Sequence, residues 1–95
     1  MDILIEGSML QSESDFHHEL AVVLGVEAYY GYNLDALWDL LSASIERPIL
    51  LRWVCSNESK EYLGDRFEEI INVLERVKKQ DERFGLSERF DYCLE

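Results

Sequence analysis

The chain has 95 residues, 47% of them hydrophobic, and a formal net charge of −11 at pH 7. This length predicts a single domain, residues 1–95, and the hydrophobic content excludes a chain that is disordered throughout. No apolar run approaches the length of a membrane span, and the first residues lack the basic flank and long apolar stretch of a signal peptide, so we expect a cytoplasmic protein.

The first half of the chain predicts one strand and two helices. Residues 2–7 (DILIEG) form a short apolar run that a glycine ends, which indicates a strand buried on both faces. Residues 12–25 carry apolar side chains at helical spacing, with Ser12 or Ser14 as N-cap and Gly25 as stop signal at the end. Asn33 offers the N-cap of the next predicted helix, residues 34–45.

The second half predicts a strand, two helices and a final strand. Residues 49–55 (ILLRWVC) form a largely apolar, partly β-branched run, again typical of a strand buried on both faces. Residues 56–64 predict a short helix, and residues 65–80 predict a long one with an apolar stripe. In residues 88–95 the apolar side chains alternate as they do in a strand.

The predicted order of elements is β-α-α-β-α-α-β. Strands separated by helices favour a parallel sheet reached through right-handed crossovers, with the helices packed on it. We therefore predict an α/β fold with a small three-stranded parallel sheet and four helices. Such a fold does not determine a function by itself.

The predicted helix over residues 34–45 carries two aspartates on one flank. Its core stripe lies within about 60° of the first leucine on a helical wheel and consists of Leu34, Leu37, Trp38, Leu41 and Ile45. Asp35, Asp39 and Ser42 lie outside this stripe, and Trp38 borders them. Two like charges four residues apart destabilise a helix by roughly 0.2–0.5 kcal/mol, and no base on this helix relieves the repulsion.

A catalytic role for these residues is disfavoured. Two carboxylates can act as acid and base in a desolvating cleft, but Asp35 and Asp39 project from one exposed flank with no sign of such a pocket. His17 and His18 are adjacent and diverge by about 100°. Neither has a Cys or His at metal-ligand spacing, so we expect solvent-exposed helical histidines. With no GxGxxG, Walker loop, nucleophile elbow or CxxC, the sequence predicts a protein that is not an enzyme and needs no cofactor or metal.

The two cysteines, Cys55 and Cys93, lie far apart in apolar segments. A disulfide scaffold would need more cysteines and a secreted context. We therefore predict two buried free thiols.

Residues 29–41 (YYGYNLDALWDLL) have the composition of a binding surface. They contain three tyrosines, one tryptophan and two aspartates, and no cation. Tyr and Trp are common at the centre of protein interfaces, and aspartates without intramolecular bases can accept hydrogen bonds from a partner's Arg and Lys. A second interpretation stays open from spacing alone: Tyr29 and Tyr30 pack over the edge of the core, while Asp35 and Asp39 are simply solvated.

The distribution of charge favours a basic protein as partner. Residues 1–46 contain nine acidic residues and no Lys or Arg, whereas residues 47–95 contain eleven acidic and all nine basic residues. The first half therefore carries −9 of the net −11. Such a surface repels nucleic acid and anionic membranes and attracts a basic protein, although acidity that only keeps a protein soluble has the same composition.

The run YYGYNLDALWDLL closely resembles the signature of the barstar family, small intracellular inhibitors of secreted bacterial ribonucleases. ILIEG resembles the first strand of that family, SDFHHEL its first helix, RPILLRWV its second strand and VLERVKK part of its last helix. The resemblance implies a three-stranded parallel sheet with the first strand in the middle, covered by four helices. It also implies an immunity protein, or antitoxin, that is a monomer when free and plugs the active site of a basic bacterial ribonuclease.

The resemblance also assigns roles to residues of this chain. Asp39 matches the family's central aspartate, whose carboxylate takes the place of an RNA phosphate among the active-site cations of the enzyme. Asp35 matches a second anionic anchor beside it, and neighbouring loop and helix residues seal the groove. The complete set of partner-binding residues that we predict is Tyr29, Tyr30, Asn33, Leu34, Asp35, Trp38, Asp39, Ser42, Glu46 and Arg76.

Several positions depart from the family pattern. Arg76 and Gln80 stand on the last helix where inhibitors of barnase carry acidic residues. Ser44 stands where a tryptophan is found in the family's well-known member, and Tyr32 replaces an acid in the loop. These changes leave the central aspartates intact but indicate a ribonuclease other than barnase. An acidic adaptor, or a nucleic-acid mimic, on the same fold without ribonuclease inhibition stays open as the alternative function.

Overall fold

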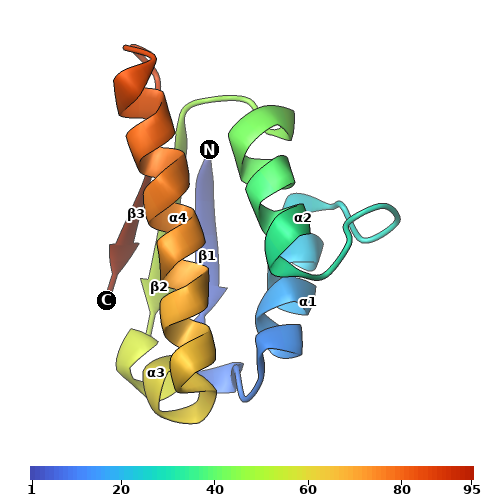
Figure 1. Ribbon diagram of the computed structural model, residues 1–95. Helices are drawn as coiled ribbons and strands as arrows, with labels where there is room; N and C mark the ends of the chain where they lie inside the picture. Colours follow the sequence, from blue (N-terminus) through green and yellow to red (C-terminus); the bar gives the residue numbers. More distant parts are fainter.

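The computed structural model describes all 95 residues and contains one parallel sheet. Its strands are β1 (Asp2–Glu6), β2 (Ile49–Val54) and β3 (Phe90–Leu94), in the spatial order β1-β2-β3 (Figure 1). Both strand pairs are parallel. Together with four α-helices, this sheet confirms the predicted α/β fold class.

The predicted central position of the first strand is wrong. β2 is the central strand, with Leu51 opposite Ile3 on one side and opposite Tyr92 on the other. Each helical connection therefore leads to the adjacent strand, as consecutive strands do in most sheets. An apolar run in the sequence indicates burial but does not identify the neighbouring strands, so the order had to come from tertiary structure.

The helices follow the predicted order closely. They are α1 (Glu13–Leu24), α2 (Leu34–Asp39), α3 (Ser56–Leu63) and α4 (Asp65–Arg83), with a 3-10 turn at Gly7–Met9 and a π-helical turn at Leu40–Ser44. The helix predicted over residues 34–45 therefore changes to wider π-helical bonding directly after Asp39. None of the helices combines the length and hydropathy that crossing a membrane requires.

The predicted caps of the first two helices are confirmed. The side chain of Ser12 accepts a hydrogen bond from the backbone N–H of Asp15 at 3.2 Å, and that of Asn33 accepts one from Ala36 at 2.8 Å. Gly25 ends α1 with a φ of 69°, a left-handed conformation that favours glycine. These caps fix where the loop between α1 and α2 begins and ends.

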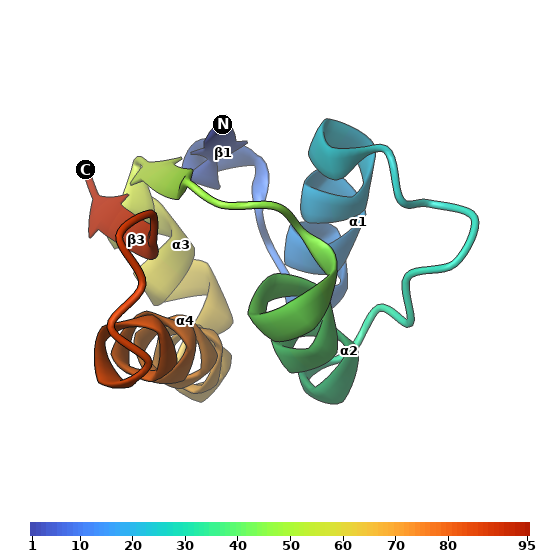
Figure 2. The same cartoon turned by 90° about the horizontal axis from the view of Figure 1, so that it is seen from above.

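The helices cover one face of the sheet and leave the other open (Figure 2). The inward side chains Ile3 and Leu51 have no exposed surface, whereas Leu4 is 50% exposed and Arg52 is exposed. The prediction that the first two strands are buried on both faces is therefore wrong. The outward face carries apolar side chains such as Leu4, so the sequence pattern of these strands is that of strands buried on both faces.

Trp53 joins the central strand to three helices. Its ring stacks on Phe16 of α1, with centroids 4.9 Å apart, and meets Phe67 of α4 edge-on at 5.1 Å. Its indole Nε1 donates to Ser59 Oγ of α3 at 2.9 Å, and Ser59 donates to the carbonyl of Gly7 at 2.8 Å. The buried polar atoms of the tryptophan and the serine are thus both satisfied.

Cys55 and Cys93 are both free, as predicted. Cys55 is exposed and Cys93 is only half-buried, so the prediction that both thiols are buried is wrong. Cys55 follows β2 with a φ of 53°, where the chain turns sharply into α3. That turn directs the residue to the surface although the preceding run is apolar.

Candidate protein-binding site

Residues 29–41, with their two aspartates, form a projecting loop and α2, and α2 packs against α4 (Figure 2). Leu37 and Leu41 face the core with no exposed surface, as the helical wheel predicts, and Leu34 and Trp38 are half-buried. Leu40, which is not on the predicted stripe, is also buried. The loop before α2 folds over that side of the helix, so the buried arc is wider than the stripe.

Gly31 allows this loop to approach α2 closely. A Cβ at this position would lie 2.9 Å from the Cβ of Ala36, which is closer than real Cβ contacts. Asn33 then starts the helix with its side-chain oxygen on the N–H of Ala36, so this predicted contact residue also has a structural role. The loop is thereby held next to the two aspartates.

Asp35 and Asp39 are both exposed. Neither carboxylate takes part in any ion pair of the protein or in a side-chain hydrogen bond. They lie one helical turn apart on the solvent side of α2 and its continuation. The structure therefore brings together two exposed carboxylates that are free to accept hydrogen bonds from a partner.

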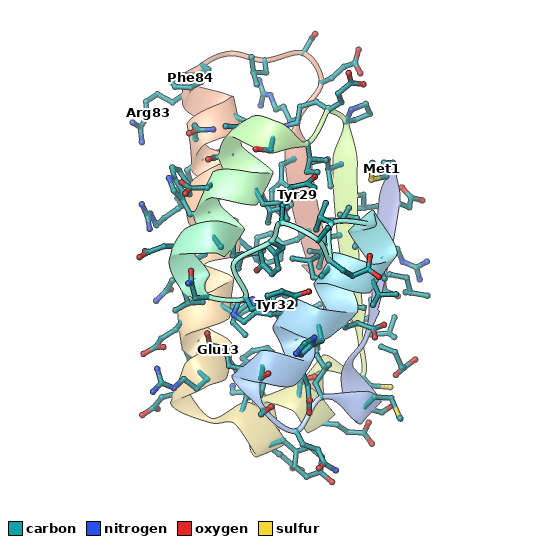
Figure 3. The ribbon with its side chains drawn as sticks, turned by 90° about the vertical axis from the view of Figure 1, so that its right-hand side faces the viewer. Met1, Glu13, Tyr29, Tyr32, Arg83 and Phe84 are labelled. Carbon is teal, nitrogen blue, oxygen red and sulfur yellow. The ribbon has the colours of Figure 1, made fainter.

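The two tyrosines that open the stretch lie in different environments. Tyr29 is 70% exposed on the loop (Figure 3), whereas Tyr30 is 6% exposed. The Tyr30 hydroxyl lies 2.6 Å from Nδ1 of His17, whose Nε2 lies 2.9 Å from Oε2 of Glu13. Burial above all, followed by the charges of Glu13 and Tyr32, raises the pKa of Tyr30 above its ordinary value. Tyr30 thus anchors the loop, and Tyr29 faces solvent.

His17 is 1% exposed, so the prediction of two solvent-exposed histidines is wrong for this residue. His18 is exposed and packs against Tyr32, with ring centroids 4.7 Å apart. The partner that makes a buried imidazole possible, Tyr30, is distant in sequence, so spacing along the helix gave no sign of it. No group of three His, Cys, Asp or Glu side chains is placed to hold a metal ion.

Asp39 lies at the wall of an open hollow of about 280 Å³. The lining residues are Tyr29, Tyr30, Gly31, Ala36, Asp39, Leu40 and Ser44. Asp39 is the one acidic residue among them, and there is no base. A cationic side chain that enters this hollow would meet a single carboxylate between aromatic and apolar walls.

Arg76 of α4 lies over the ring of Trp38. Its guanidinium carbon is 4.4 Å from the ring centroid, within the range of a cation–π contact. Both residues line a second hollow of about 330 Å³, which Asp35 also lines. Arg76 is exposed and takes part in no ion pair. The structure therefore places Arg76 at the edge of the predicted surface.

Ser42 and Glu46 lie further along the chain. Ser42 is half-buried, and its carbonyl accepts a hydrogen bond from the side-chain amide of Gln80 at 3.3 Å, which ties the π-helical turn to α4. Glu46 is exposed beyond the end of that turn and lines none of the surface hollows. Of the predicted contact residues, Asn33, Ser42 and Glu46 are thus the three that line no hollow.

Sequence reasoning missed several residues that line these hollows. Ala36 and Leu40 line the hollow beside Asp39 together with residues of the loop before α2, and this contact between loop and helix left no signal in the sequence. A further hollow beside Trp38 includes residues near the end of α4 that were not predicted, namely Lys79, Arg83 and Phe84. Helical spacing places Lys79 and Arg83 on the same face of α4 as Arg76, but the packing that brings this face to Trp38 joins two helices and left no signal within either one.

The chain matches a known family of protein inhibitors. The family profile described as Barstar (barnase inhibitor) matches residues 1–93, and the chain belongs to this family. It is similar to a protein of Bacillus subtilis (strain 168) that carries the name "Putative ribonuclease inhibitor YrdF". The two are 30% identical over 78 residues, which cover 82% of this chain and 86% of that protein. The family resemblance stated from the sequence is confirmed.

Proposed function

We propose that this protein inhibits a basic bacterial ribonuclease inside the cell that makes it, by blocking the active site with α2 and the loop before it. Family membership and the name of the Bacillus subtilis relative support the proposal. The observation that carries it is the pair of exposed, unpartnered carboxylates of Asp35 and Asp39 beside the rings of Tyr29 and Trp38.

Asp39 is the residue that we expect to enter the active site of the enzyme. A ribonuclease binds the phosphates of RNA with cationic side chains, and a carboxylate placed among them accepts charge-assisted hydrogen bonds in the same way. The hollow beside Asp39 offers room for one of these cationic side chains. Asp35, one helical turn away, presents a second carboxylate to the same cluster.

The residues around the aspartates would seal the groove of the enzyme. Tyr29 presents a largely exposed ring on one side of Asp39, and Trp38 presents a half-buried ring on the other side of α2. Asn33 and Leu34 lie between them at the start of the helix. Aromatic side chains around a desolvated charge exclude water and strengthen its hydrogen bonds, which is typical of interface hot spots.

The charge of the whole chain would assist the encounter. Residues 1–46 contain nine acidic residues and no Lys or Arg. A field of one sign attracts an oppositely charged protein and raises its association rate by about 10 to 10³. Inhibition of a cationic ribonuclease is therefore expected to be fast at low salt and slower at high salt.

Ribonuclease inhibition can be tested directly. The purified protein is titrated against the secreted and toxin-associated ribonucleases of its own organism, and against barnase, with a fluorogenic RNA substrate. We expect at least one enzyme to lose its activity at an equimolar ratio, and co-expression to restore growth of cells that make that enzyme. Binding without loss of activity would favour an adaptor, and failure with every ribonuclease of the organism would sink the proposal.

A further inference from the structure

A hollow of about 300 Å³ near the C-terminal end of α4 is lined by cations and by no acid. Its lining residues are Trp38, Arg76, Lys79, Gln80, Arg83 and Phe84. The chain has 20 acidic residues against nine basic ones, so three bases without an acid depart from its general character. This hollow adjoins the one that Asp35 lines, because Trp38 and Arg76 line both of them.

The three bases share one face of α4, because they are spaced at i, i+3 and i+7. Lys79 has a partner, Glu75, at 3.6 Å, but Arg76 and Arg83 take part in no ion pair. The helix dipole favours Arg83 in the last turn, yet it gives little to Arg76 two turns earlier. No carboxylate of the protein pairs with Arg76 or Arg83.

Arg76 is held ready to bind. Its guanidinium carbon lies over the Trp38 ring, 4.4 Å from the centroid, and a ring makes no N–H···O bonds, so the guanidinium keeps its N–H groups free for an acceptor. Gln80, which lies between the bases, donates to the carbonyl of Ser42 and fixes α4 against the π-helical turn. Arg76 and Gln80 are thus positioned by contacts within the protein before any partner arrives.

Phe84 also lines the hollow. Its side chain is 65% exposed, and Figure 3 shows Phe84 and Arg83 together at the C-terminal end of α4, pointing away from the sheet. A large exposed ring beside two unpaired guanidinium groups suits an acceptor that stands on a protein surface with apolar neighbours. Carboxylate side chains meet this description, and their two oxygens match the N–H pairs of an arginine.

We propose that this hollow binds a carboxylate of the inhibited ribonuclease, contributed by a segment beside its cationic active site. The inference rests on the proposed function and extends it: the target presents cations to Asp35 and Asp39 and an acidic side chain to Arg76 and Arg83. RNA is the other ligand with matching oxygens. The net charge of −11 and the nearby Asp35 oppose a polyanion, whereas a single carboxylate on a basic protein feels little of that repulsion.

The hollow can be tested without the ribonuclease. The isotope-labelled protein is titrated at low ionic strength with a capped tri-glutamate peptide, and the side-chain N–H resonances of Arg76, Arg83 and Trp38 are followed by NMR. We expect one saturable process at these three side chains and no response to capped tri-glutamine. Arg76→Gln and Arg83→Gln should each lower the affinity for the peptide by about threefold. Lys60→Gln, which removes an exposed charge without an ion pair on α3, should leave the affinity unchanged.

Each other result would overturn the inference. Equal shifts at all exposed cations would show that the hollow has no selectivity. Tetrauridylate, which has the same charge as the peptide, would make the hollow a phosphate site if it saturated the same resonances at lower concentration. Because no ribonuclease is used, a failure here leaves the inhibitor function untouched, and a failure of inhibition leaves this measurement valid.

Discussion

The imidazole of His17 on α1 lies 2.6 Å from the hydroxyl of Tyr30 on the loop before α2. Both side chains are buried, and the carboxylate of Glu13 lies 2.9 Å from the other ring nitrogen. The pair links the body of the protein to the loop on which the neighbouring residue, Tyr29, faces solvent. The geometry of the proposed binding surface therefore depends on a contact inside the core.

Tyr30→Phe removes the hydroxyl and leaves a buried nitrogen of His17 without its partner. We expect the free energy of unfolding to fall by about 1–3 kcal/mol, as is usual for an unsatisfied buried group. Ribonuclease inhibition should weaken as well, because the loop loses its anchor. Urea unfolding and the inhibition constant measure the two effects. Tyr29→Phe is the matched control. The hydroxyl of Tyr29 is on an exposed side chain and makes no hydrogen bond, so its removal should leave the free energy of unfolding unchanged.

Asp39→Ala tests the proposed centre of the interface. Because Asp39 is exposed and makes no contact that holds the fold, the free energy of unfolding should hardly change. Binding to an inhibited ribonuclease should weaken by at least about 2 kcal/mol, the usual threshold for a hot spot. Isothermal titration calorimetry and urea unfolding separate the two quantities.

Asp2→Ala is the control for the loss of one negative charge. Asp2 is also exposed and unpaired, but it lies on β1 rather than on α2. This variant should bind almost as tightly as the unchanged protein. An unchanged affinity in Asp39→Ala would remove Asp39 from the interface, and loss of the fold would mean that its position outside the core has been misjudged.

The carboxylate of Asp81, near the end of α4, has no exposed surface and accepts three hydrogen bonds. Arg47 donates from Nε at 2.8 Å and from Nη2 at 3.1 Å, and the backbone N–H of Phe90 donates at 2.7 Å. Burial raises the pKa of Asp81, but the hydrogen bonds and the charge of Arg47 outweigh it and hold the pKa below its ordinary value. The pair joins the end of α4 to the starts of β2 and β3.

Asp81→Asn should lower the free energy of unfolding at pH 7 by about 3–5 kcal/mol, because Arg47 is left without its carboxylate. A lowered pKa stabilises the fold above the ordinary pKa of 3.8 and loses that effect as the pH falls through the lowered value. The difference between the two proteins should therefore shrink below about pH 4. Urea unfolding at several pH values measures it, and a difference that stays constant down to pH 2 would contradict the assignment.

The elements were predictable because their signals are local. Caps such as Ser12 and Asn33 and the 3.6-residue spacing of apolar side chains act within a few residues, so the helices appeared in the right places. The order of the strands was not predictable, since an apolar run such as that around Leu51 carries no information on its neighbours. The open face of the sheet was missed for a related reason, because Leu4 is apolar although it is half exposed.

In the candidate site too, features that depend on one segment were predictable, and features that depend on contacts between segments were not. The wheel placed Asp35 and Asp39 off the core stripe, and both are exposed in the structure. The burial of His17 and Tyr30 depends on a contact between α1 and a loop that follows it, so no pattern within either segment revealed it. The contact of Arg76 with Trp38 likewise joins two helices, and only the family resemblance set them side by side in advance.

Arg76→Glu should change the association rate in opposite directions for barnase and for the ribonuclease that the protein normally inhibits. Arg76 lies over Trp38 at the edge of the proposed surface and forms no ion pair with a carboxylate of the protein. A cation there repels a strongly basic nuclease, so we expect weak inhibition of barnase and faster association after the substitution. Association with the ribonuclease that the protein normally inhibits should instead become slower, since the acidic side chain facing Arg76 would then meet a carboxylate. Charges at the edge of an interface act mainly on the association rate and its salt dependence, so stopped-flow measurements at two salt concentrations are the appropriate readout. Equal rates for the two proteins with both enzymes would make Arg76 an ordinary solvated residue and would place specificity elsewhere on the surface.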